Sequence, residues 1–168
     1  MSDQMEMYDV VDSLDRVIGT ATRREIHQKG LLHRSVHILV FNSKGELYLQ
    51  KRSLNKDENP GYWDTSAAGH VNAGEDYMTS AHRELEEELG IRAELQEIGR
   101  FTACPETFGE HVRIYTCVSD ATIVINPREI IEGRFWTFDE IDRALVDPDI
   151  PFTSTFGLIL DTFHEIIR

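Results

Sequence analysis

Two β-rich runs separated by a short turn constrain the fold of this chain more than any other feature. The segment SVHILVFN covers residues 35–42, and the segment KGELYLQKR covers residues 44–52. The Asn-Ser-Lys-Gly sequence where they meet is typical of a β-hairpin. The next segment, residues 53–66, is polar and contains a Pro-Gly pair. It is therefore expected to form a loop.

Helical patterns alternate with further strand patterns along the rest of the chain. Extended segments are expected at residues 8–12, 17–21, 92–104, 111–119 and 133–138, and helices at 22–30, 76–89 and 139–146. The C-terminal segment 153–168 should lay one apolar face on the sheet, formed by Phe156, Ile159, Leu160, Phe163, Ile166 and Ile167. Strands interspersed with helices predict an α/β (α+β) fold, in a single domain spanning residues 1–168.

The charge of the chain limits its partners. Of the 168 residues, 40% are hydrophobic and 28% are charged, and the formal net charge is −13. A field of that sign disfavours a nucleic-acid polymer or an anionic membrane as a partner. A few local cations together with a bound metal ion can still attract a phosphorylated small molecule.

The cysteines and the N-terminal residues predict a cytoplasmic location. Cys104 and Cys117 are too few for a disulfide framework and fit no metal-ligand spacing, so we expect reduced thiols. The first residues lack a basic start followed by an apolar stretch. No run approaches the ~18 apolar residues that span a bilayer, so no membrane partner is expected.

A cluster of glutamates at residues 84–88 calls for an explanation, because like charges four apart on a helix repel at a cost of ~0.2–0.5 kcal/mol per pair. In a helix over 76–89, Glu84, Glu87 and Glu88 project from one face. Three apolar residues on a neighbouring face are expected to be buried: Met78, Leu85 and Leu89. The acids form either a solvated face or a cradle for Mg²⁺ or Mn²⁺, which take hard oxygen ligands.

The spacing of these acids to other residues matches a known motif. Gly69, then Glu75, then RELEEELGI from Arg83 to Ile91 reproduce the whole Nudix box, G-x5-E-x7-R-E-U-x-E-E-x-G-U with U aliphatic. Such a match would arise by chance in this chain with a probability on the order of 10⁻⁶. The chain therefore resembles the Nudix hydrolase superfamily. The resemblance implies a Nudix fold, with a mixed β-sheet sandwiched between helices, and cleavage of a diphosphate linked to another group, X.

The resemblance also implies a role for each box residue. In that family the glutamates matching Glu84, Glu87 and Glu88 bind divalent metals, and the glycine matching Gly69 can contribute its carbonyl. The arginine matching Arg83 is expected to orient the acids, and Glu75 closes the loop onto the helix. The implied cofactor is Mg²⁺ or Mn²⁺, the implied substrate is a small-molecule diphosphate, and a homodimer is an expected assembly because members are often dimers.

A general base is needed besides the metal. A diphosphate resists attack because its oxygens repel hydroxide, so catalysis has to neutralise them, lower the pKa of a water and aim it at phosphorus. A carboxylate then takes the proton of that water. In the family this base is a box glutamate or an acid on a distant loop. We favour Glu87 or Glu129; the distant candidates are Glu106, Glu110, Glu129 and Glu132.

Residues 31–91 also resemble the isopentenyl-diphosphate isomerase branch of the superfamily. Arg52 and Lys56 match positions that hold the diphosphate in those isomerases, although simple solvation also explains exposed cations. The position of the isomerase cysteine is occupied by Ala68, and the isomerase's second acid aligns near His111. Losing both groups would remove proton chemistry at carbon and leave the diphosphate chemistry in place.

The histidines and aromatic residues leave alternatives open. His33 and His70 match isomerase metal ligands and His27 lies close to a third, but each also fits a packed or hydrogen-bonded role. Phe108, in a loop beside a glycine, is the favoured residue for binding X. The candidates for stacking on X are Tyr62, Trp63, Phe108, Tyr115, Phe135 and Trp136, and core packing is the alternative for the last three.

Three functions follow from these patterns. The first is a metal-dependent pyrophosphohydrolase that cleaves a nucleoside diphosphate derivative or a similar small diphosphate. The second is an isopentenyl-diphosphate isomerase-like enzyme, which needs acid and base groups at carbon. The third is a non-catalytic nucleotide-binding sensor on the same fold. The complete set of box acids counts against it, because a protein that only binds would not need every one.

Overall fold

The computed structural model describes residues 3–168 and contains a mixed β-sheet of seven strands within that range. The path of the sheet is β5-β4-β3-β8-β7, and β6 pairs with β3 and β9 with β4. Strands β3 and β8 are parallel, whereas the other pairs are antiparallel. The bounds are β3 His33–Phe41, β4 Leu47–Arg52, β5 Trp63–Asp64, β6 Ala67–His70, β7 Gln96–Phe101, β8 Glu110–Val118 and β9 Ile130–Trp136.

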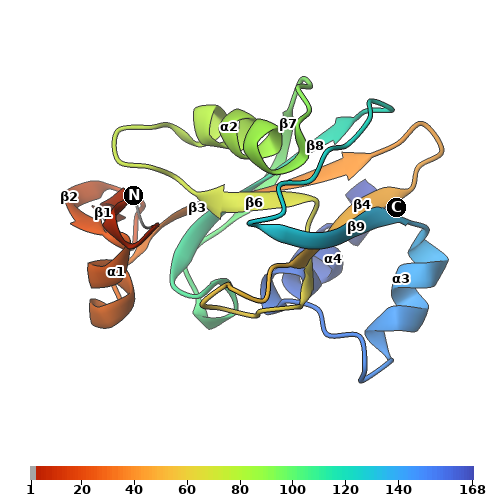
Figure 1. Cartoon of the computed structure of the whole chain (residues 1–168). Helices are drawn as coiled ribbons and strands as arrows, with labels where there is room; N and C mark the ends of the chain where they lie inside the picture. Colours follow the sequence, from red (N-terminus) through yellow and green to blue (C-terminus); the bar gives the residue numbers. More distant parts are fainter. Residues whose placement is uncertain (1–2) are drawn as a thin grey trace.

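Helices cover both faces of this sheet (Figure 1). Helix α2, Tyr77–Leu89, packs on one face, and α3, Phe138–Leu145, and α4, Ser154–Ile167, pack on the other. A small sheet of β1 and β2 lies with α1 at one end of the molecule. The remaining bounds are β1 Met7–Val11, β2 Val17–Thr22, α1 Arg23–Lys29 and the 3-10 helices η1 Asp3–Met5 and η2 Pro105–Thr107. The predicted mixed sheet between helices is confirmed.

Helix α2 is fixed at both ends by the residues that its sequence provides. Asp76 is the N-cap, and its side chain accepts a hydrogen bond of 2.7 Å from the Thr79 amide. Gly90 ends the helix in the left-handed conformation, with φ of 66°. Leu85 and Leu89 are fully buried, as predicted.

The expected burial of Met78 is wrong, because this side chain is 39% exposed. Tyr77 takes the inward position in the first turn of α2 and is 5% exposed. The guanidinium of Arg113 lies over its ring, 4.1 Å from the centroid, and its hydroxyl donates to Asp15 at 2.8 Å. The aromatic ring therefore anchors the start of the helix in place of the methionine.

The C-terminal helix α4 departs from the expected periodicity near its end. Phe156, Ile159 and Leu160 are buried as predicted. The backbone leaves helical geometry at Phe163, where φ is −111° and ψ is 15°. This kink rotates the last turn, so that Ile167 is buried while Ile166 is 62% exposed. The expectation that Ile166 lies on the sheet is therefore wrong.

Other elements also differ from the expected pattern. Trp63–Asp64 lies inside the segment predicted as a loop but forms the short strand β5, paired to β4. Strand β7 begins at Gln96, later than the expected start of that extended segment. Both cysteines are free thiols, as expected. Within residues 3–168, no helix combines the length and apolar character needed to cross a bilayer.

Candidate active site

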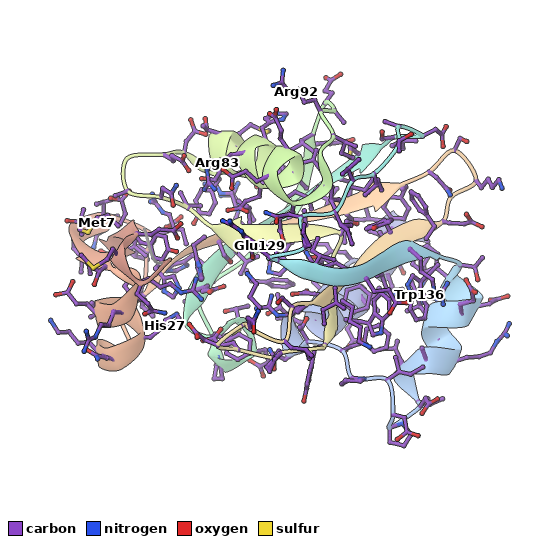
Figure 2. All side chains as sticks on the ribbon, viewed as in Figure 1. Met7, His27, Arg83, Arg92, Glu129 and Trp136 are labelled. Carbon is purple, nitrogen blue, oxygen red and sulfur yellow. The ribbon has the colours of Figure 1, made fainter. Side chains whose placement is uncertain are left out.

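A cleft beside the edge of β6 gathers most of the residues singled out from the sequence. Its volume is about 180 Å³, and mostly polar and charged side chains line it. Figure 2 labels Arg83 on α2 and Glu129 next to the start of β9, both of which line the cleft, whereas Arg92 lies at the periphery. The predicted site residues that line the cleft are Arg52, Lys56, Gly69, Arg83, Glu84, Glu87, Glu88, Phe108 and Glu129.

The three box glutamates of α2 differ in burial. Glu88 is 4% exposed, and its Oε1 accepts a hydrogen bond of 2.7 Å from the Ala68 amide. Burial raises the pKa of Glu88 to about 7. Burial and the charge of Glu88 raise the pKa of Glu84 to about 8. Glu87 is largely exposed at the cleft rim. The carboxyl groups of Glu84 and Glu88 are therefore held close together, where their negative charges repel each other.

Arg83 connects these acids to the loop before the helix. Its Nη1 donates to Glu84 at 2.8 Å and to Glu87 at 3.3 Å, and its Nη2 donates to the His70 carbonyl at 3.1 Å. Glu75 receives further bonds from Arg83 and from the Ser80 hydroxyl. Although burial opposes it, this pairing lowers the pKa of Glu75. Glu75 does not line the cleft, but it holds Arg83, which does.

Gly69 leaves the space that the Glu84 carboxylate occupies. A Cβ added to Gly69 would lie 2.1 Å from both Cδ and Oε1 of Glu84, well inside contact distance. The carboxylate therefore rests directly on the backbone of β6. This close approach gives a physical reason for the glycine at the first position of the box.

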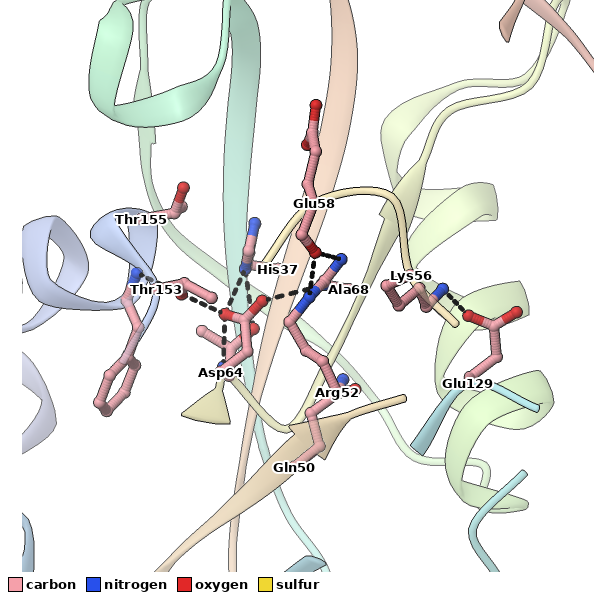
Figure 3. Close-up of polar contacts among 12 residues, drawn as sticks. His37, Gln50, Arg52, Lys56, Glu58, Asp64, Ala68, Glu129, Thr153 and Thr155 are labelled. Atoms are coloured by element: carbon pink, nitrogen blue, oxygen red, sulfur yellow. Dashed lines mark hydrogen bonds and ion pairs between the residues drawn. The ribbon is translucent and has the colours of Figure 1, made fainter. Parts of the chain in front are cut away.

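Two cations and a carboxylate form another part of the cleft lining (Figure 3). Lys56 pairs with Glu129, and burial lowers the pKa of Lys56. Arg52 donates to the Glu58 carbonyl at 3.2 Å and 3.1 Å, and its Nη1 lies 3.4 Å from Asp64. Both cations are partly buried and held by partners, which distinguishes them from solvated surface residues.

The candidates for the general base separate by position. Glu87 and Glu129 line the cleft. Glu110 also lines it, but its carboxylate is engaged by two histidines. Glu106 and Glu132 are exposed and do not line the cleft. Glu87, which Arg83 contacts at 3.3 Å, and Glu129, which pairs with Lys56, therefore remain the candidates.

A second group of ligand type lies in the same cleft. His70 Nε2 is 2.7 Å from Glu110 Oε1, and His33 Nε2 is 3.2 Å from the same oxygen. Although burial alone would raise it, these imidazoles hold the pKa of Glu110 well below its usual range. Two imidazoles and one carboxylate this close could hold a metal ion. His27 is exposed and falls outside this group.

Sequence reasoning did not assign Glu110 to this group. The parallel register of β3 and β8 places Glu110 beside His33, a pairing that no local spacing shows. His111 had been aligned loosely with the second acid of the isomerases. Its Nε2 instead lies 2.9 Å from the Asp12 carbonyl. Arg23 and Tyr8 also line the cleft and were not singled out.

The aromatic candidates divide between the core and the cleft. Trp63, Tyr115 and Trp136 are buried in the hydrophobic clusters. Phe135 packs edge-on against Tyr48, with ring centroids 5.2 Å apart. Phe108 lines the cleft, is 44% exposed and has a left-handed backbone, with φ of 56°. Tyr62 is partly buried and does not line the cleft.

The raised pKa values predict a pH dependence of stability for the metal-free protein. A carboxyl whose pKa rises on folding, from 4.5 to about 8 for Glu84, holds its proton in the folded state after the unfolded chain has released it. Stability is therefore lost as the pH rises from about 4.5 to about 8. Denaturant unfolding in EDTA should show a fall on the order of a few kcal/mol over this window. The Glu84→Gln variant should show a flatter profile, and parallel profiles would contradict this assignment.

Comparison with known proteins identifies the family. A model of the NUDIX domain matches residues 31–156. An uncharacterised Nudix hydrolase of Pseudomonas aeruginosa is 47% identical over 131 residues, which cover 77% of this chain and 78% of that protein. An isopentenyl-diphosphate Delta-isomerase 2 of Photorhabdus laumondii is 44% identical over 163 residues, covering 93% and 91%. The chain belongs to the Nudix family.

A solved structure agrees with this identification. The crystal structure of a protein of Deinococcus radiodurans superposes with a TM-score of 0.80 at 26% identity, covering 94% of this chain and 99% of that one. Membership of the Nudix family supports an activity of the pyrophosphohydrolase type. Relatives named as isomerases exist on the same fold.

Proposed function

We propose that this protein is a divalent-metal-dependent hydrolase that cleaves the diphosphate linkage of a nucleoside diphosphate derivative or a similar small diphosphate. The observation that carries the proposal is the arrangement of the cleft. The box carboxylates Glu84, Glu87 and Glu88 and the cations Arg52 and Lys56 all line the same cleft. A diphosphate bridged to a metal needs both kinds of group.

The residues fit a bound Mg²⁺ or Mn²⁺. The donors are carboxylate oxygens, with the Gly69 carbonyl as a further candidate, and these are the ligands that both ions prefer. Burial and repulsion from neighbouring carboxylates raise the pKa values of Glu84 and Glu88 despite the nearby cations, and a bound divalent cation would offset both effects. When bound, the ion would neutralise phosphate oxygens and lower the pKa of a water.

The chain's own residues supply positioning and proton transfer. Arg52 and Lys56 bind the phosphate oxygens of the substrate by charge-assisted hydrogen bonds. Arg83 holds Glu84 and Glu87 in place, and Glu75 holds Arg83. Glu129 or Glu87 takes the proton from the attacking water. Phe108 contacts the group X from the rim of the cleft.

A substrate panel tests this proposal. Purified protein is incubated with nucleoside di- and triphosphates, sugar nucleotides, dinucleotides and isoprenoid diphosphates, each with Mg²⁺, Mn²⁺ or EDTA. We expect hydrolysis of at least one diphosphate that depends on the metal and stops in EDTA, with each product identified by mass. Equal turnover in EDTA would count against the metal site, and no turnover of any compound with either metal would refute the proposal.

Isomerisation of isopentenyl diphosphate is the second candidate. The cluster of His33, His70 and Glu110 and the relatives named as isomerases favour it. The side chain of Ala68, in contrast, has no proton to transfer at the position matching the isomerase cysteine. Incubation of isopentenyl diphosphate in deuterated water separates the two activities, because only isomerisation incorporates deuterium into the recovered isoprenoid.

A further inference from the structure

Strand β3 contributes Ser35 and His37 to the lining of the cleft, and we call this part of the lining the floor. His33, Ser35 and His37 alternate onto the same face of the strand, which continues with Leu39 in the hydrophobic cluster beneath α4. All three polar residues are buried, with exposures of 3%, 3% and 6%. Ser35 and His37 both line the cleft. A strand face that changes from apolar to polar beside a cleft indicates a place where a polar ligand is bound.

His37 presents an unpaired ring nitrogen to this floor. Its Nδ1 lies 2.7 Å from the Thr65 hydroxyl, which in turn lies 3.4 Å from the Ala67 carbonyl. Nδ1 is thus engaged by Thr65, whichever of the two groups donates. Burial lowers the pKa of His37, which favours the neutral ring. Nε2 is therefore left to donate or to accept one hydrogen bond, according to the tautomer.

Figure 3 shows how the His37 ring is oriented. One ring nitrogen of His37 faces Asp64, and the other points away from it. Within residues 3–168, Nε2 has no hydrogen-bond partner, whereas Asp64 is occupied by the Thr65 amide at 2.7 Å, Thr153 Oγ1 at 3.0 Å and Arg52 Nη1 at 3.4 Å. Asp64 is therefore fully engaged by these partners, and Nε2 of His37 is left for a ligand.

Ser35 provides a second unused group on the same strand face. Its Oγ is buried and has no hydrogen-bond partner among the described residues. A buried hydroxyl without a partner is uncommon in a folded protein, because its desolvation is then uncompensated. Its position in the lining of the cleft indicates that a ligand supplies the missing partner.

We propose that the floor formed by Ser35 and His37 binds a hydroxyl-bearing group, such as a sugar ring, attached directly to the diphosphate. This inference rests on the proposed function, because Arg52 joins the floor to the phosphate-binding wall through Asp64. His37 Nε2 forms a hydrogen bond with one hydroxyl of the ligand, which can donate or accept, and Ser35 Oγ pairs with another. In a nucleoside 5′-diphosphate, the ribose is the group that occupies this floor.

An apolar chain does not suit the same surface. A prenyl group over Ser35 and His37 would cover both polar groups without a partner, and each such group weakens binding roughly tenfold or more. The floor therefore selects against hydroxyl-free substituents as well as for hydroxylated ones. Selectivity follows from the protein's own unsatisfied groups, in addition to the contacts of the diphosphate.

Matched substrates test the inference. KM and kcat are measured with Mg²⁺ for the four ribonucleoside 5′-diphosphates, their 2′,3′-dideoxy counterparts and isopentenyl diphosphate. We expect KM to be about tenfold or more higher for the dideoxy compounds than for their ribose partners. Equal KM values, or a preference for isopentenyl diphosphate, would overturn the inference and leave hydrolysis itself established.

Variants locate the effect on the floor. Ser35→Ala should raise KM for the ribose compounds about threefold to tenfold, with kcat and the dideoxy KM little changed. Its melting temperature should not fall, because the Ser35 hydroxyl has no partner to lose. His37→Phe should act in the same direction, and Ser43→Ala, an exposed serine, is the matched control. An unchanged ribose-to-dideoxy ratio in the folded Ser35 variant would contradict the inference.

A binding measurement tests the inference independently of turnover. If no compound were hydrolysed, the proposed function would fail, and calorimetric titration of the same ribose and dideoxy pairs with Mg²⁺ would still measure the preference. Tighter binding of the ribose compounds, lost in Ser35→Ala, would support the floor as a sugar site. Equal affinities would reject it.

Discussion

Replacing Glu88 by Gln should lower the rate of metal-dependent diphosphate hydrolysis by about a thousandfold or more, a loss of ~4 kcal/mol in transition-state stabilisation. The side chain keeps its size, and its remaining carbonyl can still accept the hydrogen bond from the Ala68 amide. What disappears is one negative charge of the proposed metal cradle. Initial rates with saturating Mg²⁺, on the best substrate of the panel, measure the loss.

The same substitution should not destabilise the metal-free protein. The raised pKa of Glu88 means that its charged form is disfavoured in the fold, so a neutral amide removes an unfavourable charge. The melting temperature in EDTA at a pH of about 8 should therefore equal or exceed that of the wild type. Glu86→Gln is the control on the same helix, because Glu86 is exposed and pairs with Arg92 at 2.6 Å.

Two results would reject this view of Glu88. One is hydrolysis by the folded Glu88→Gln variant at a rate close to that of the wild type. The other is an equal loss in Glu86→Gln, because a residue outside the cleft would then matter as much as one inside it. Measuring both variants together separates the proposed metal site from general effects of charge on α2.

The sequence predicted the parts of this molecule that local spacing controls. A helix over 76–89 follows from its cap residues and apolar face, and the convergence of Glu84, Glu87 and Glu88 follows from helical periodicity. The lining of the cleft agrees with that convergence. Strands β3 and β4 were also predicted, because the apolar pattern of a strand and the sequence of a turn can be recognised within a few residues.

Features that depend on strand pairing could not be predicted from local spacing. Glu110 lies beside His33 only because β8 runs parallel to β3, and the two residues are far apart along the chain. Ser35 and His37 lie in an apolar run and were not assigned a role. Their signal was the polar alternation at 33, 35 and 37, which becomes informative once the cleft is known to cover that face.

Burial at the ends of helices was the other source of error. Met78 and Ile166 both satisfy helical spacing, yet both are exposed. Tyr77 takes the inward position at the start of α2, and the kink at Phe163 turns the end of α4. Periodicity extrapolated to the first or last turn fails because packing at helix ends depends on the particular neighbours that lie there.

Replacing Gly69 by Ala should reduce hydrolysis by about a hundredfold or more while leaving the fold intact. The new Cβ would lie 2.1 Å from the Glu84 carboxylate, so one of the two has to move. The carboxylate is the end of a flexible side chain, whereas Gly69 is held in β6 opposite Val36. Glu84 therefore leaves its position, and displacement of a proposed metal ligand by about 1 Å is enough to cost this much.

The matched control for this substitution is Gly19→Ala. Gly19 is also in a strand, and an added Cβ would meet nothing within 4 Å. Both variants should melt near the wild-type temperature, and only Gly69→Ala should need a higher Mg²⁺ concentration for half-maximal rate. An unchanged metal requirement in Gly69→Ala would mean that Glu84 does not bind the ion. Because Glu84 is displaced without loss of its charge, this result separates the position of the carboxylate from its presence, which Glu84→Gln alone does not do.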